Sequence, residues 1–230
     1  MATIKLGSIA SDIRGSIGGT VFSRNGGGAY AKQRTKGTDP RTSLQQVVRS
    51  IMSGMIGYWA ALTAAVREDW AVYARQVPFI NRLGDAINLS GYNMYCRTRS
   101  LCELIGVAMP AAAPTTMYLA EADPSVGITP DASDQDVEIA FDNTLGWANE
   151  VGGYLLAYQG LPQPATRNSY SGPFLYAGKV SGAVSAPTSP ATLALPYSMA
   201  AGQKCFMQFR TMRADGRVSA PFRCVGIVGA

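Results

Sequence analysis

The stretch Asp136-Val137-Glu138-Ile139-Ala140-Phe141-Asp142 places Val137, Ile139 and Phe141 at every second position. Because successive side chains of a β-strand point to opposite faces, this alternation predicts a strand with these three residues facing a core. Further β-prone runs follow at 154–158, 174–180, 192–195, 205–212 and 218–228. Short strands separated by turn signals predict an antiparallel β-sandwich over residues 126–230.

The last two runs bracket Ala214-Asp215-Gly216, and an Asp-Gly turn between strands predicts a hairpin. Cys205 and Cys224 lie 10 residues before and 9 after Asp215, so they should fall opposite one another or nearly so. A one-residue slip would place them on opposite faces. We expect free thiols in a reducing cytoplasm, and a disulfide between them is the alternative.

Four carboxylates occur near the start of the expected sandwich, on Asp134, Asp136, Glu138 and Asp142. Three of them alternate with the core-facing residues, so a solvated outer face is the expected environment. A weak calcium site at this edge of the sheet is the alternative.

A Pro/Ala-rich linker is expected at 108–125, and it separates the strands from a helical module at 42–107. Thr42 or Ser43 should cap the first helix, with Gln45 or Gln46 completing a capping box. Thr63 should cap a second helix over 64–76 that ends before Pro78, and Ser90 should start a third helix that runs through Ile105.

Each predicted helix carries apolar residues at helical spacing. On the third helix these are Met94, Leu101 and Ile105. On the second they are Val66, Trp70 and Tyr73 or Ala74. The first helix has the longest stripe: Leu44, Val47, Val48, Ile51, Met52, Met55, Ile56 and Trp59. We interpret Trp59 and Trp70 as core residues of the module.

The basic, glycine-rich segment 1–41 does not resemble a self-contained fold. Runs at 20–24 and 29–35 flank Asn25-Gly26-Gly27-Gly28, which predicts a hairpin because such turns need positive φ. A lone hairpin is marginal in water, so it should pair with the rest of the chain or with a neighbour. We expect an extended arm that orders on assembly; the alternative is a floppy N-terminus.

Charge is unevenly distributed. Residues 1–107 carry 13 Lys/Arg against 6 Asp/Glu, a net of +7, whereas residues 108–230 carry 7 against 9, a net of −2. This asymmetry predicts an acidic partner for the first half, either a protein surface or packaged nucleic acid. The expected assembly contacts are the cations and aromatics of the arm: Arg14, Phe22, Arg24, Tyr30, Lys32, Arg34, Lys36 and Arg41.

The sequence contains no histidine, which excludes Ser-His-Asp and Cys-His nucleophiles and most zinc sites. The glycine-rich segment 15–28 matches neither a P-loop nor a dinucleotide fingerprint. We therefore expect a non-enzymatic protein with no catalytic residue, cofactor or metal site. No apolar run approaches a membrane span, and the first residues lack the apolar region of a signal peptide. We expect a protein made in the cytoplasm, without membrane contact.

The N-terminal half resembles a known family. The similarity begins with Ile13-Arg14-Gly15-Ser16-Ile17-Gly18-Gly19-Thr20-Val21-Phe22-Ser23-Arg24-Asn25, and continues through Asp39-Pro40-Arg41-Thr42, Trp59, Leu62-Thr63, Arg67, Trp70 and Leu89-Ser90-Gly91-Tyr92-Asn93. This pattern is similar to small structural proteins encoded in tailed-phage and prophage genomes, in which Asn and Phe usually stand at the positions of Asp39 and Tyr95. The resemblance implies a virion or morphogenesis protein.

The segment from Cys205 to Pro221 resembles the penultimate strand, turn and start of the last strand of a fibronectin type III or immunoglobulin-like domain. Phage virions often display such domains. The two resemblances imply a virion protein that is assembled in the host cytoplasm, forms homo-oligomers and binds other virion proteins. We expect a capsid decoration or cement protein that grips the major capsid protein. The alternatives are a head–tail connector, neck or tail accessory protein, and a nucleic-acid-binding packaging protein.

Overall fold

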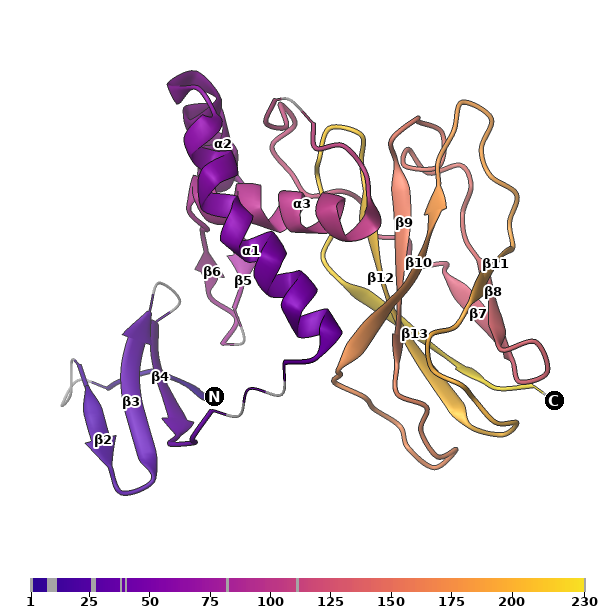
Figure 1. Ribbon diagram of the computed structural model, residues 1–230, viewed down its shortest axis with the longest axis horizontal. Helices are drawn as coiled ribbons and strands as arrows, with labels where there is room; N and C mark the ends of the chain where they lie inside the picture. Colours follow the sequence, from indigo (N-terminus) through magenta and orange to yellow (C-terminus); the bar gives the residue numbers. More distant parts are fainter. Residues whose placement is uncertain are drawn as a thin grey trace. The chain divides into compact units, whose positions relative to one another are not determined.

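Figure 1 shows the computed structural model, which describes residues 2–7, 12–25, 28–37, 39, 41–81, 83–110 and 112–229. Among these residues are three helices and four sheets with antiparallel strands, which confirms the expected α+β class. The chain divides into two compact units, Met1–Met94 and Tyr95–Ala230. The division falls inside the third helix, ahead of the linker expected at 108–125.

The N-terminal sheet contains β1 (Ala2–Ile4), β2 (Gly15–Ile17), β3 (Thr20–Asn25) and β4 (Gly28–Gln33), in the order β1-β4-β3-β2. The expected hairpin is formed by β3 and β4, and Gly28 has a φ of +109°. Gly26, Gly27 and Pro40, which also entered the turn predictions, lie outside the described residues. Because β1 and β2 flank the hairpin, it pairs with strands of its own chain.

The first two helices begin at the predicted caps. In α1 (Ser43–Ala61) the Thr42 side chain accepts from the N–H of Gln45, and in α2 (Ala64–Gln76) the Thr63 side chain accepts from the N–H of Val66. These bonds satisfy N–H groups that have no partner within the helix. The Gln46 amide donates to the carbonyl of Arg41.

The apolar stripe of α1 is only partly buried. Met55 is fully buried, whereas Val48, Met52 and Ile56 are 54%, 49% and 70% exposed. These three residues recur every fourth position and therefore share one side of the helix. The side chain of Leu44 lies outside the described part of the chain.

Helix α2 contributes three buried residues to the core of the first unit. Its Trp70, Tyr73 and Ala74 are each 1% exposed, as its spacing predicts, whereas Trp59 of α1 is half-buried and packs edge-on against Tyr92. Two short strands, β5 (Phe79–Ile80) and β6 (Ala86–Ile87), form a hairpin after α2. Helix α3 (Gly91–Ile105) then begins where Ser90 accepts from the N–H of Asn93.

The second unit contains two sheets around a common core (Figure 1). One sheet has the order β11 (Ala191–Ala194), β8 (Asp136–Ala140), β7 (Gly127–Asp131). The other has the order β10 (Phe174–Ser181), β9 (Tyr154–Gly160), β12 (Lys204–Met212), β13 (Phe222–Ile227). Val137 and Ile139 of β8 are fully buried, as the alternation predicts, and they pack with Leu155, Met207 and Phe209 from the facing sheet.

The C-terminal half of α3 packs on the outer face of the four-stranded sheet. Its Cys102 and Ile105 form a buried cluster with Leu156 and Met212. The Arg97 guanidinium donates to two carbonyls of the segment before β13 at 3.0 and 2.8 Å. The helix therefore covers part of this sheet. Beside β13 the loop after β9 covers another part, where the Tyr170 ring packs on Phe206 and the Arg223 guanidinium donates to the Tyr170 carbonyl.

The hairpin between β12 and β13 turns at Asp215-Gly216, where Gly216 has a φ of +89°. Near the turn Met212 pairs with Val218, but farther along Phe209 pairs with Phe222. One extra residue on the second strand accounts for this shift in register, as in a β-bulge.

Candidate assembly interface

The residues expected to make assembly contacts come from the N-terminal sheet and the chain around it. Phe22 and Arg24 lie in β3, and Tyr30 and Lys32 lie in β4. Phe22 pairs with Ala31, which is the neighbour of both Tyr30 and Lys32. Because neighbouring residues in a strand point to opposite faces, Phe22 and Arg24 share one face and Tyr30 and Lys32 the other. The structure therefore divides these residues between two faces.

The N-terminal sheet has no fully buried residue among those whose burial the structure describes. Among the described residues up to Gly54, every side chain is half-buried or exposed, and Ile17 of β2 is 75% exposed. A sheet normally gains its stability by burying one face against another layer. The described part of the chain therefore leaves both faces of this sheet incompletely buried.

The cations around the sheet fall into two groups. Arg14 pairs with Asp12 at 2.8 Å, and Arg49 and Arg41 pair with Asp39 at 2.8 and 3.7 Å. The Arg49 guanidinium lowers the pKa of Asp39 below its ordinary value. The second group makes no ion pair with any described residue and is exposed: Arg24, Lys32, Arg34 and Lys36.

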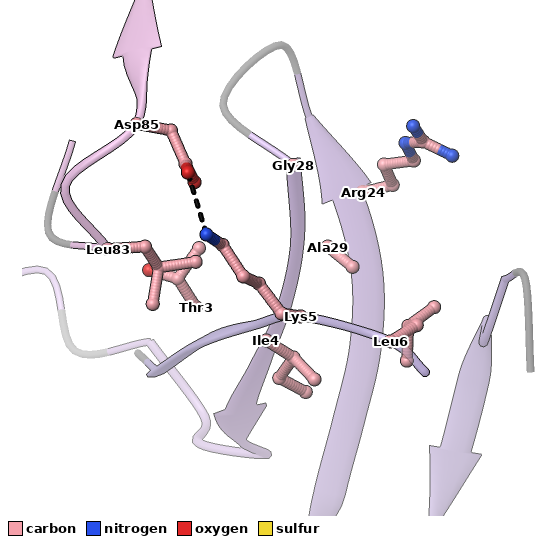
Figure 2. Close-up of a pocket in the computed structure, with 9 residues that line it drawn as sticks. All are labelled: Thr3, Ile4, Lys5, Leu6, Arg24, Gly28, Ala29, Leu83 and Asp85. Atoms are coloured by element: carbon pink, nitrogen blue, oxygen red, sulfur yellow. Dashed lines mark hydrogen bonds and ion pairs between the residues drawn. The ribbon is translucent and has the colours of Figure 1, made fainter. Parts of the chain in front are cut away.

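One ion pair joins the sheet to the turn between β5 and β6. The Lys5 ammonium, just after β1, lies 2.7 Å from a carboxylate oxygen of Asp85, and Figure 2 shows the two side chains meeting. They line a shallow pocket of about 280 Å³, together with Leu83 and Arg24. The Arg24 guanidinium extends away from the pair (Figure 2). Arg24 therefore remains available to a partner outside the chain.

The turn that carries Asp85 is held by Asn81. The Asn81 side-chain oxygen accepts from the N–H groups of Leu83 and Asp85 at 2.8 and 2.9 Å. The Asn81 amide donates to the Asp85 carboxylate at 3.3 Å. The Lys5 ammonium, and then this amide, lower the pKa of Asp85 below its ordinary value. The carboxylates of Asp39 and Asp85 are thus both kept ionised by paired cations.

The four cysteines are free thiols. Cys205 pairs with Gly226 and Cys224 with Met207, so the two cysteines are diagonal neighbours on the core face of the hairpin. Diagonal positions are roughly 7–8 Å apart, beyond the reach of most disulfides. Burial raises the pKa of Cys102 and Cys205 to about 11 and that of Cys224 to about 12. These thiols are therefore protonated near neutral pH.

The carboxylates of β8 point outward, as their alternation predicts. Asp136 and Glu138 flank the fully buried Val137, and Asp142 accepts from the N–H and hydroxyl of Thr144. In the described part of the chain, no group of three or more Asp, Glu, Cys or His side chains is arranged to hold a metal ion. Nor does any described helix have the length and apolar character to cross a membrane.

No protein-family model matches the chain, and no curated protein matches its sequence. Three features of the first unit, as far as the structure describes it, therefore bear on function: a sheet with no fully buried residue, exposed cations with no carboxylate partner, and an exposed apolar row on α1. Sequence reasoning identified the cations but missed the pairing of Lys5 with Asp85, because 80 positions separate these residues and neither lies in a motif.

Proposed function

We propose that this protein is a structural component of a tailed-phage particle, in which its N-terminal sheet acts as an arm that docks on a neighbouring subunit. A capsid decoration or cement role fits best, with the major capsid protein as the neighbour. The observation that carries the proposal is the sheet itself, which has four strands and no buried residue among those described. A surface of a neighbour would supply the missing layer.

The charges of the arm indicate the chemistry of that surface. Arg24, Lys32, Arg34 and Lys36 have no carboxylate partner among the described residues. An exposed cation gains little from one acidic partner, because solvent and salt screen the attraction. Repeated over many symmetric copies of an acidic shell, the same contacts add up. The edge strands β1 and β2 also offer backbone groups for pairing with a neighbour's sheet.

The exposed row on α1 supports a second contact of the same kind. Val48, Met52 and Ile56 lie together on one side of a helix whose only charged residue is Arg49. Arg49 is already paired with Asp39. An uncharged apolar helix side of this sort is suited to packing against another protein.

We further propose that the second unit is a fibronectin type III or immunoglobulin-like sandwich displayed on the particle. Three features support this: seven strands, a division into antiparallel sheets of three and four, and chain crossings between the sheets from β8 to β9, β10 to β11 and β11 to β12. A fully buried core between two sheets gives such a domain independent stability.

Nucleic acid is the second candidate partner, because the same four exposed cations could neutralise phosphates. The two candidates differ in a measurable way. Binding of duplex DNA by the full-length protein, with affinity that falls steeply as salt rises, would favour a packaging role. A head–tail connector, neck or tail accessory protein would use the same arm against a different protein neighbour.

The test compares limited proteolysis of the free protein with that of the assembled particle. We expect cleavage within residues 1–41 in the free protein and protection in the particle. Replacing Lys32 and Arg34 by Gln should reduce incorporation into particles, whereas Arg75→Gln, which removes an exposed α2 cation paired with Glu68, should not. An arm that is cleaved equally fast in both states would contradict the proposal.

A further inference from the structure

The two sheets of the second unit carry opposite charges. The strands of the four-stranded sheet contain no Asp or Glu, and their cations are Lys179, Lys204, Arg210 and Arg223. The strands of the three-stranded sheet contain no Lys or Arg, and their carboxylates belong to Asp131, Asp136 and Glu138. The second half of the chain is therefore near neutral as a whole, although one of its sheets is basic and the other is acidic.

These charges point outward, to opposite sides of the unit. Cys205, Met207 and Phe209 face the core, so the alternate residues Lys204 and Arg210 face out. Arg223 shares their face because it pairs with Gln208. We call Lys204, Arg210 and Arg223 the basic sheet face. On the other sheet, Asp136 and Glu138 flank the buried Val137 and so face outward, and Asp131 pairs with Asp136 and shares its face. We call Asp131, Asp136 and Glu138 the acidic sheet face.

Neither face is neutralised within the unit. None of these cations and carboxylates forms an ion pair with another described residue, whereas other charges of the unit do, as in the Arg213–Glu150 and Arg217–Asp215 pairs. On the acidic sheet face Asp131 and Asp136 pair directly across the strands, an arrangement that like charges disfavour. On the basic sheet face burial lowers the pKa of Arg210, whose guanidinium donates to the carbonyl of Ser219 at 3.4 Å. Lys204 and Arg223 donate to the carbonyls of Arg167 and Tyr170.

The shapes of the two faces are also compatible. Beside the basic sheet face a groove of about 490 Å³ is lined by Arg210, Gln208, Tyr158 and Phe174. On the same side of the edge strand, Val225 and Ile227 are 52% and 65% exposed. On the acidic sheet face the two residues that pair with Glu138 are threonines, whose side chains are shorter than the exposed Glu138 side chain. A carboxylate that projects beyond shorter neighbours can enter a groove that contains a guanidinium.

We propose that the basic sheet face of one copy binds the acidic sheet face of a second copy, head to tail. The contact is heterologous, so each complex keeps one free face of each sign and a third copy can add. Such contacts close into rings or grow into filaments. The inference rests on the proposed structural role for its biological setting, and it names a second copy of this chain as a partner of the displayed unit.

The test uses the purified full-length protein without particles, so its result is independent of the arm experiment. In sedimentation velocity the protein should associate as its concentration rises, and less so in high salt. Arg223→Glu and Glu138→Lys should each lower the association constant at least about tenfold, because each places like charges in contact. Lys204→Glu serves as a second variant of the basic sheet face. Asp69→Lys, which reverses an exposed charge on α2, is the matched control and should associate like the wild type.

A mixture of the two variants provides the decisive measurement. Arg223→Glu keeps the acidic sheet face intact, and Glu138→Lys keeps the basic one. An equimolar mixture should therefore associate, although neither variant associates by itself. The proposal is overturned if the wild type stays monomeric at low salt, if association survives both reversals, or if folded variants, checked by circular dichroism, fail to pair in the mixture.

Discussion

Gly91, the first residue of α3, lies directly against the backbone of Ala71 in α2: a Cβ on Gly91 would stand 2.8 Å from both the Cα and the N of Ala71. Real Cβ atoms do not approach backbone atoms so closely, so the two helices can cross at this distance only because position 91 has no side chain. The crossing places Tyr92 against Trp59 and Met94 in the core of the first unit.

Substituting Gly91 by Ala should therefore lower the free energy of unfolding by about 1–3 kcal/mol, the usual cost of forcing extra volume into packed structure. Gly57 of α1 is the matched control, because a Cβ there would meet no atom within 4 Å. Gly57→Ala should stabilise the protein by about 0.5–1 kcal/mol, since alanine favours a helix interior. Urea unfolding of both variants gives the comparison; two changes of the same sign would contradict it.

The cap of α2 gives a second prediction. The Thr63 hydroxyl accepts the N–H of Val66, so Thr63→Ala should cost about 1 kcal/mol of stability. Thr63→Ser keeps the acceptor oxygen and should retain most of it. Thermal unfolding monitored by circular dichroism measures both. If the serine variant lost as much stability as the alanine variant, the hydroxyl would not be the stabilising group.

These caps explain which parts of the fold could be predicted. Helix α2 has the predicted bounds, because Thr63 and Pro78 act on the backbone within one turn of themselves. The outward carboxylates of β8 follow from simple alternation in the same way. Features that depend only on residues close together in the chain, such as helix ends and the outward face of a strand, could therefore be predicted from the sequence.

Other features depend on residues far apart in the chain. Strands β1 and β2 have three residues each, too few to show a period, and they exist because β4 and β3 lie beside them. Periodicity marked the apolar positions of α1 but could not tell that Met55 is covered while Ile56 is open. The diagonal placement of Cys205 and Cys224 depends on a one-residue register shift near the turn, which no spacing count reveals.

The Lys5–Asp85 and Arg49–Asp39 ion pairs of the first unit can be separated by titration. Lys5→Met should raise the pKa of Asp85 toward its ordinary value of 3.8 and leave that of Asp39 unchanged. Arg49→Met should do the reverse. In each case the lowered pKa stabilises the fold above pH 3.8, and that contribution is lost as the pH falls through the folded-state pKa. Carboxyl carbon shifts in NMR report each aspartate; a coupled response would contradict independent pairs.

The buried thiols should react slowly and destabilise the fold at alkaline pH. With a pKa of about 11, Cys205 forms about a hundredfold less thiolate at pH 8 than an ordinary thiol, so alkylation should wait for unfolding. Because its folded-state pKa is raised, its contribution to stability is complete below about pH 9 and lost as pH rises through about 11. Alkylation with and without guanidinium, followed by mass spectrometry, tests this. A Cys205–Cys224 disulfide in freshly purified protein would contradict it.

The two methionines of α1 separate folding from docking. Met55 is fully buried and Met52 is 49% exposed, although both lie on the same helix and have the same side chain. Met55→Ala should cost about 2–5 kcal/mol, because it leaves a cavity in packed structure. Met52→Ala should change stability by less than about 0.5 kcal/mol, as surface substitutions usually do.

Met52→Glu should also leave the isolated protein folded, yet it would bury a charge if α1 packs against a neighbour. Its incorporation into particles should therefore fall while its unfolding midpoint stays that of the wild type. Normal incorporation of Met52→Glu would mean that this side of α1 faces solvent in the particle, and docking would then depend on the N-terminal sheet alone.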